Sequence, residues 1–283
     1  MKTAIITAID DNYKKTLEND FLETLRNIAK YAGLVYVIYY GKDKKFAKRI
    51  EKKYNVKILF YIKKRDVPTQ RIIDIAKIIK TMPNDITNIM CIDGGDVWFQ
   101  KPIDIIFELT KNSYGIIEEN QKASQNFNLD CINNIKDRKI KELFLNETKD
   151  YNLLAVGMIV GNRNKVEFIY KKISEFIKIM KQDFFGIEQC IMNYVARKEG
   201  GYTILPLKYG FSLITNKYFE KYSEIKNGLF YDENNELITV VYNSGFDDRF
   251  FPNGRADIKD VKKFPKKLPG SFWGITCFFN PQG

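Results

Sequence analysis

Two aspartates enclose two glycines in the segment Asp93-Gly94-Gly95-Asp96. The apolar residues 89–92 just before it predict a short buried strand, and the glycines predict a tight turn where that strand ends. Two carboxylates so close together suit a hard divalent cation such as Mg²⁺ or Mn²⁺, which prefers oxygen ligands. The same four residues also suit a solvated turn, because Asp and Gly favour turns for backbone reasons. The spacing alone leaves both interpretations open.

The composition is that of a soluble globular protein. The chain has 283 residues, of which 45% are hydrophobic and 29% are charged, enough to bury a substantial core. No apolar run approaches the roughly 20 residues that span a bilayer, and the first ten residues do not form a signal peptide. We therefore expect a cytoplasmic protein, with the inner face of the membrane as a peripheral location.

Histidine is absent, which excludes Ser-His-Asp triads, Cys-His dyads and every zinc site that uses histidine. Acid and base chemistry is left to Asp, Glu, Lys, Tyr or Cys. The four cysteines, at 91, 131, 190 and 277, are widely separated, show no Cys-x-x-Cys pair and are expected to be reduced.

The formal charge of +11 favours an anionic partner: a nucleic acid, a membrane surface or a phosphorylated small molecule. Lysines on the solvated faces of predicted helices explain most of this excess. The segment 246–283 is basic and aromatic, so an anionic membrane surface is a candidate partner for it, and a tail that packs its aromatic rings on the body of the protein is an equal alternative.

The hydrophobic pattern of the first third alternates between strands and helices. Strands are predicted at 2–9, 34–40, 56–62 and 89–92, and helices at 21–29, 46–54 and 68–79. Such alternation predicts a parallel sheet covered by helices, whose ligands bind beyond the carboxyl ends of the strands. Asp10 and Asp93 both fall at such ends.

The remainder of the chain continues the α/β pattern less regularly. Strands are predicted at 114–117, 153–160 and 202–207, and the last of them is expected at an edge of the sheet. Helices are predicted at 102–109, at 166–180 and from 184 onward. Residues 229–231 and 237–242 are predicted to form a hairpin. Residues 120–150 are polar and weakly periodic, and we interpret them as an insertion that helps shape a substrate site.

This order of elements, ending in Asp93-Gly-Gly-Asp96-Val-Trp-Phe, resembles the glycosyltransferases of the GT-A fold, and most closely the family-8-type sugar transferases of bacteria, over residues 1–245. The resemblance implies an α/β, Rossmann-like, mixed and mostly parallel sheet with helices on both faces and a small C-terminal appendage, 246–283. It also implies a nucleotide-binding half, 1–110, and an acceptor-binding half, 111–245.

Several residues in the nucleotide-binding half match the family one by one. Thr7, Ala8, Ile9 and Asp10 correspond to the place where the family cradles the base and ribose of the nucleotide, and Arg71 to a basic residue that faces the donor sugar and phosphates. The acidic turn, with Gly94 and Gly95, corresponds to the family's Asp-x-Asp. Without the resemblance, Asp10 is equally well explained as a helix N-cap, and Arg71 as a surface charge.

In the acceptor-binding half, the strand around Gly157 resembles the family's Asn-Ala-Gly strand, although Ala155 stands in place of the asparagine. Glu188-Gln189 resembles an Asp-Gln pair that lines the pocket between donor and acceptor. Tyr242-Asn243 lies in the neighbourhood of a late histidine that helps bind the metal in the family. Glu188, near a predicted helix start, is alternatively a partner of the helix dipole.

Two departures affect the metal site that the resemblance implies. The acidic pair is one residue longer than Asp-x-Asp, and the late histidine is missing. Asp93 and Asp96, with Asn243 as a further oxygen ligand, are the predicted ligands of Mn²⁺ or Mg²⁺, while a metal-independent variant would neutralise the leaving diphosphate with Lys and Arg alone. Glu188 and Asp96 are the predicted catalytic residues. Glu188 is the acceptor base if the reaction inverts, and steadies the acceptor or the cationic transition state if it retains.

The predicted function is therefore transfer of a sugar from a nucleotide sugar, with a UDP-sugar favoured, to a hydroxyl of a glycan, glycolipid or protein. A nucleotidyltransferase that makes nucleotide sugars is an alternative, but it would be expected to carry a Gly-rich phosphate loop after the first strand, which residues 7–12 lack. A non-catalytic nucleic-acid-binding protein would explain the charge but not the carboxylates. The chain shows no nucleic-acid motif, and we expect no such partner.

Overall fold

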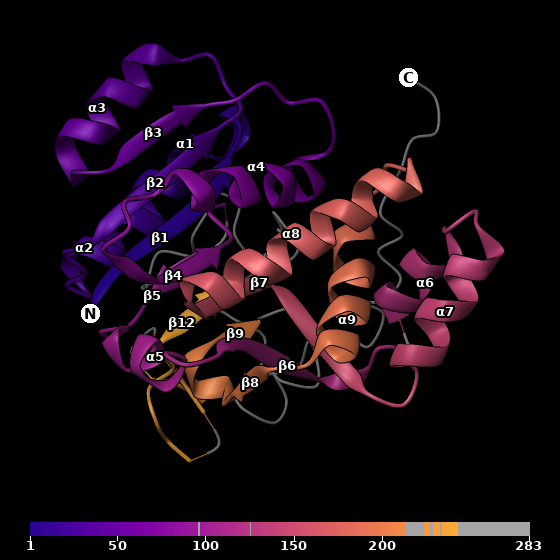
Figure 1. The fold of residues 1–283 in the computed structure, drawn as a ribbon. Coiled ribbons are helices and arrows are strands. Elements are labelled where there is room, and N and C mark those ends of the chain that lie inside the picture. The colour runs from indigo at the N-terminus through magenta and orange to yellow at the C-terminus, as the bar shows by residue number, and fades with distance from the viewer. Residues whose placement is uncertain (96, 125, 213–223, 227–228, 233, 243–283) are drawn as a thin grey trace.

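The computed structural model describes residues 1–95, 97–124, 126–212, 224–226, 229–232 and 234–242 (Figure 1). Asp96, Asn243 and the whole segment 246–283 lie outside the described residues, so the predictions made for them remain predictions. Within the described part of the chain, no helix is both long and apolar enough to cross a membrane.

A seven-stranded sheet in the order β3-β2-β1-β4-β7-β6-β8 forms the centre of the protein. Four of its neighbouring pairs are parallel, and β7 is antiparallel to both β4 and β6, which confirms the mixed, mostly parallel sheet. The edge position predicted for the strand after residue 202 is also confirmed. The strands are β1 (Lys2–Ile9), β2 (Leu34–Tyr39), β3 (Lys57–Phe60), β4 (Ile86–Ile92), β6 (Tyr114–Lys122), β7 (Asn152–Asn162) and β8 (Tyr202–Leu205).

Helices cover both faces of this sheet because its inner strands are apolar on both sides. In β1, Ala4 and Ile6 belong to one hydrophobic cluster and Ile5 and Ile9 to the other, as expected when successive side chains point to opposite faces. The first cluster includes α4 (Val67–Thr81), α8 (Arg163–Met180) and α9 (Ile187–Glu199). The second includes α3 (Lys44–Tyr54) and α5 (Asp104–Leu109).

The helix between β1 and β2 begins earlier than the pattern predicts. A 3-10 turn (Asp11–Tyr13), α1 (Lys14–Thr16), a π-helical turn (Leu17–Leu22) and α2 (Glu23–Asn27) follow one another without a break. Asp10 starts this stretch, because its side chain accepts a hydrogen bond from the Asn12 amide at 3.0 Å. The early turns carry exposed polar residues, so the apolar periodicity marks only the later part.

Residues 120–150 contain two helices, α6 (Asn126–Asn133) and α7 (Arg138–Thr148). Asp137 caps α7 by accepting hydrogen bonds from the amides of Lys139 and Ile140 at 2.9 and 3.1 Å. The buried Phe144 stacks on Tyr194 of α9, with ring centroids 4.7 Å apart. Because few residues of α7 are buried, its helical period is weak in the sequence.

The predicted hairpin near residue 235 is confirmed at its turn, where the Asp232 amide donates to the Glu236 carbonyl at 2.8 Å and the Ile238 amide donates to the Phe230 carbonyl at 3.0 Å, but not over its whole length. One antiparallel bridge joins Tyr231 to Leu237, but β11 (Leu229–Tyr231) pairs with β10 (Glu224–Lys226). The second segment, β12 (Val240–Tyr242), instead joins β5 (Val97–Phe99) and β9 (Phe211–Ser212) in a three-stranded sheet. Because β5 follows the acidic turn, this small sheet brings the late part of the chain to that turn, which the local pattern of a hairpin did not indicate.

Candidate functional site

The acidic turn packs tightly against the end of β1. The Asp93 amide donates to the Gly157 carbonyl at 3.0 Å, which ties the turn to β7. A Cβ on Gly94 would collide with the Thr7 hydroxyl and lie 3.0 Å from Ile9 Cγ2, and one on Gly95 would lie 2.5 Å from the Tyr13 ring. The two glycines are therefore needed for close approach.

Arg71 on α4 forms an ion pair with Asp93, from Nη1 to Oδ1. Their side chains are only 11% and 20% exposed, so Arg71 is not an ordinary surface charge. Water screens a pair at this depth far less than it screens a surface pair. The structure thus places a cation beside the first carboxylate of the acidic turn.

Glu188 lies in the first turn of α9 and is only 4% exposed. Among the described residues, its Oε2 atom has no hydrogen-bond partner. Burial raises the pKa of Glu188 above its usual value, because desolvation penalises the charged form; the positive charge of Arg71 opposes this shift only in part, and Asp66 adds to it. Arg71 therefore acts electrostatically on two carboxylates, Asp93 by direct pairing and Glu188 through the field.

Gly157 keeps a space open beside Asp93. A Cβ at this position would lie 3.2 Å from Asp93 Oδ2 and 3.8 Å from Cε2 of Tyr242. Tyr242 ends β12 and pairs with Val97, directly after the acidic turn. The structure thus brings the acidic turn, the β7 glycine and the end of β12 together, as the resemblance implies.

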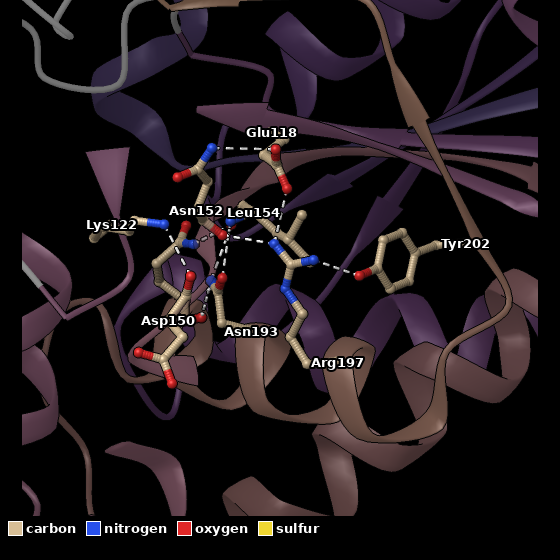
Figure 2. Close-up of polar contacts among 9 residues, drawn as sticks. Glu118, Lys122, Asp150, Asn152, Leu154, Asn193, Arg197 and Tyr202 are labelled. Atoms are coloured by element: carbon tan, nitrogen blue, oxygen red, sulfur yellow. Dashed lines mark hydrogen bonds and ion pairs between the residues drawn. The ribbon is translucent and has the colours of Figure 1, made fainter. Parts of the chain in front are cut away.

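Gln189 and Asn193 on α9 hold the part of β7 that β4 does not reach. Pairing between β4 and β7 ends at Met158, with one more bond to the Gly157 carbonyl. Beyond it, the Val156 amide donates to Gln189 Oε1 at 3.1 Å, and the Gln189 amide group donates to the Leu154 carbonyl. The Leu154 amide donates to Asn193 Oδ1 at 2.8 Å, and Asn193 Nδ2 donates back at 3.0 Å (Figure 2).

Arg197 continues this row one turn later. Its Nη2 atom donates to Glu118 Oε2 at 2.9 Å and to the Asn152 carbonyl at 2.7 Å (Figure 2). Residues four apart lie on the same side of a helix, so Gln189, Asn193 and Arg197 fasten three successive turns of α9 to the sheet. This row fixes the helix start that carries Glu188. Asn193 and Arg197 were not predicted from the sequence, although their spacing of four and eight residues from Gln189 is a signal that could have identified them.

The predicted nucleotide cradle lies beside the acidic turn at the carboxyl end of β1. The Thr7 side chain is buried next to Gly94, and among the described residues its hydroxyl oxygen has no hydrogen-bond partner. The Ile9 carbonyl accepts from the Tyr40 amide at 2.9 Å. Asp10 has the capping role that its position suggested, and it also pairs with Lys63 at 3.4 Å.

The described residues contain one of the three predicted metal ligands. In this part of the chain, no three acidic or cysteine side chains gather closely enough to hold an ion. Asp93 fits a single ligand position, because Arg71 takes Oδ1 while the absence of a side chain at Gly157 leaves room next to Oδ2.

Comparison with solved structures identifies the fold. A crystal structure of the galactosyltransferase LgtC in complex with donor and acceptor sugar analogs matches with a TM-score of 0.59 at 16% identity, over 96% of this chain and 99% of that one. An active-site mutant of LgtC matches with a TM-score of 0.60 at 14% identity, with the same coverage of both chains. Mouse xyloside xylosyltransferase 1 matches with a TM-score of 0.52 at 12% identity, over 86% of this chain and 98% of that one.

The bifunctional glycosyltransferase WbbM matches with a TM-score of 0.55 at 13% identity, over 87% of this chain and 46% of that one. No model of a protein family and no curated protein sequence matches this chain. These likenesses confirm the predicted GT-A fold.

Proposed function

We propose that this protein is a glycosyltransferase that moves a sugar from a nucleotide-sugar donor, with a UDP-sugar favoured, to a hydroxyl of a glycan, glycolipid or protein. The observation that carries the proposal is the grouping of Asp93, Arg71 and Glu188 at the carboxyl edge of the parallel sheet. The shared fold supports it, since the structurally similar LgtC was crystallised with donor and acceptor sugar analogs.

Arg71 supplies positive charge where a leaving diphosphate needs it. Cleavage of the bond between sugar and diphosphate leaves negative charge on the phosphate oxygens, and a cation held in a partly dry site stabilises that charge more than one in water does. The pair with Asp93 holds the guanidinium in place before the donor arrives. Thr7, Ala8, Ile9 and Asp10 would receive the nucleotide.

Glu188 is the group that faces the acceptor. A buried carboxyl with a raised pKa accepts a proton more readily than an exposed one, as a base must. In an inverting reaction it would take the proton of the attacking hydroxyl. In a retaining reaction it would steady the acceptor or the cationic transition state. Gly157 would leave room for the sugar, with Gln189 behind it.

A divalent metal, Mn²⁺ or Mg²⁺, fits next to Asp93 Oδ2, with Asp96 and Asn243 as further proposed ligands. When bound, such an ion would supply Lewis-acid stabilisation to the diphosphate. Because Arg71 already supplies one positive charge there, we expect some residual activity without metal.

Calorimetric titration with nucleoside diphosphates, with and without Mn²⁺, tests the proposal. We expect binding of UDP that strengthens with Mn²⁺, and this strengthening should be lost in Asp96→Asn. Lys80→Gln, an exposed change on α4, is the control and should bind as the parent does.

The nucleotidyltransferase alternative predicts a different product. Incubation with a nucleoside triphosphate and a sugar 1-phosphate would then release pyrophosphate. Pyrophosphate release, together with no binding of any nucleoside diphosphate, would contradict the transferase proposal.

A further inference from the structure

The helix α3 presents a row of lysines outward at one edge of the sheet. Phe46 and Ile50 are among its buried residues, and they pack into the second hydrophobic cluster. The opposite side is exposed and carries four cations that form no ion pair within the described part of the chain: Lys44, Lys45, Lys48 and Lys52. The neighbouring β3 is an edge strand of the sheet, and no other strand that the structure describes pairs with its free side (Figure 1).

The acidic residues around this row are already engaged. Glu51 accepts the amide of Ile58 at 2.9 Å. Asp43 caps α3 by accepting the Phe46 amide at 2.9 Å, and it pairs with Lys14 at 3.1 Å. Among the described residues, neither carboxylate forms an ion pair with the four lysines, and α3 itself contains one acidic residue, so the lysine row carries net positive charge.

Two large apolar side chains are exposed at and just after the end of β3, the strand next to α3. Ile62 is 77% exposed, the largest fraction for any large hydrophobic residue that the structure describes, and Phe60 is 48% exposed. The Tyr39 ring joins Phe60 to α3, since its centroid lies 5.5 Å from the Phe60 ring and 5.7 Å from the Phe46 ring in the first turn of the helix, and Ile62 follows Phe60 by two residues. Lys64, also exposed, follows Ile62 closely in the chain.

We propose that this edge surface, formed by Lys44, Lys45, Lys48, Lys52, Phe60, Ile62 and Lys64, docks on an anionic lipid bilayer. The lysines would lie on the headgroups, with Ile62 and Phe60 at the boundary of the acyl chains. This combination of cations and protruding apolar side chains is the one that binds at a lipid interface. A nucleic acid would use the lysines but not the exposed Ile62, and an apolar protein partner would leave the lysines unpaired.

The edge surface adjoins the candidate active site. Lys63, next to Ile62, pairs with Asp10 at the carboxyl end of β1. Docking would therefore hold the carboxyl edge of the sheet close to the bilayer. This consequence rests on the proposed function: an acceptor anchored in the same bilayer, a glycolipid, would be favoured over a soluble glycan.

Sedimentation of the full chain with vesicles tests the surface. We expect binding to mixed phosphatidylglycerol and phosphatidylcholine vesicles, weaker binding in high salt, and little binding to phosphatidylcholine alone. Ile62→Ser should weaken binding to the anionic vesicles about tenfold. Lys45→Glu with Lys48→Glu should weaken it by at least about twentyfold, since each lysine contributes about fivefold.

Matched variants on α8 serve as controls. Ile179 is 65% exposed, and Lys171 and Lys178 are exposed on the same helix. Ile179→Ser and the pair Lys171→Glu with Lys178→Glu should bind vesicles as the parent does. An equal loss in both sets would show that binding depends on overall charge, and no loss in the edge variants would assign it to another part of the chain. Either result overturns the proposal.

Two further readouts distinguish the remaining outcomes. The first readout is binding to single-stranded DNA. If the double variant Lys45→Glu, Lys48→Glu loses this binding, and Ile62→Ser still binds vesicles as the parent does, the edge surface is a polyanion site and the lipid proposal fails. Hydrolysis of the donor nucleotide sugar should be unchanged in all edge variants, because none of these residues contacts the candidate site. If the transferase proposal is wrong, the parent protein will not hydrolyse the donor, and the vesicle result will be unaffected.

Discussion

Asp93 and Glu188 are two carboxylates that both interact electrostatically with Arg71, and their environments differ. Asp93 is paired with Arg71 at the end of β4. Glu188 is more deeply buried, its Oε2 has no hydrogen-bond partner among the described residues, and its pKa is raised. In the pair, the Asp93 carboxylate suits the binding of a cation and the Arg71 guanidinium that of a phosphate, whereas a desolvated carboxylate suits proton transfer. The contrast indicates how one site can divide donor binding from acceptor activation.

Removing the shared cation should have the largest effect. Arg71→Gln leaves the half-buried Asp93 without its partner, so we expect a loss of up to about 3 kcal/mol of stability and a fall of about 10² to 10³ in turnover. Urea unfolding and donor hydrolysis measure the two effects. Arg71→Lys keeps the charge and should recover part of both. Full activity in Arg71→Gln would remove the cation from the mechanism.

Loosening α9 from β7 should come next. Asn193→Ala leaves the amide and carbonyl of Leu154 without the partners that Asn193 supplies. Because these groups are buried, we expect a loss of about 2 kcal/mol, seen in chemical unfolding. Arg138→Ala, a change at an exposed helix position, is the control. A stability like the parent's would show that α9 does not depend on this clamp.

Filling the space beside Asp93 should act on the donor more than on stability. Gly157→Ala adds a Cβ 3.2 Å from Asp93 Oδ2, a contact to which the neighbours must adjust slightly. We expect the KM for the donor to rise about tenfold, a change equivalent to about 1.4 kcal/mol, with less than about 1 kcal/mol lost in unfolding. An unchanged KM would mean that the donor does not use this space.

Neutralising the other carboxylate should have a small effect on stability, of opposite sign to that of the Arg71 and Asn193 variants. Because its pKa is raised in the folded state, Glu188 adds to the free energy of unfolding in full when the pH is below its pKa in the unfolded chain, near 4.5. This stabilisation is lost as the pH rises through the pKa in the folded state. Glu188→Gln does not titrate there, so relative to the parent it should gain about 1 kcal/mol at pH 8 and little at pH 4.5. A gain that does not depend on pH would contradict the assigned burial effect.

The fold was predictable from the sequence where one physical signal dominates. The apolar strands before Asp10 and Asp93 and the striped helix with Pro68 in its first turn all reappear, because a helix-covered parallel sheet requires them. The two helices in 120–150 were not predicted, since their few apolar contacts, such as Phe144, leave a weak period. The pairing of β12 with β5 joins segments far apart in the chain, which local pattern does not encode.

The candidate site was predictable in its residue types but not in their contacts. The resemblance identified Arg71 and Glu188, but the ion pair with Asp93 and the unpartnered Oε2 of Glu188 depend on tertiary packing. Gln189 was assigned to the pocket, whereas its side chain bonds to the backbone of β7, together with Asn193. Its proposed contact with substrate remains a prediction.

The release of nucleoside diphosphate from a panel of nucleotide sugars tests the central claim most directly. The parent chain should release UDP from at least one UDP-sugar, faster with Mn²⁺ than without, and Arg71→Gln should reduce that rate by at least about a hundredfold while Lys80→Gln does not. Folded parent protein that releases no nucleoside diphosphate from any nucleotide sugar, with either metal or none, would contradict the account.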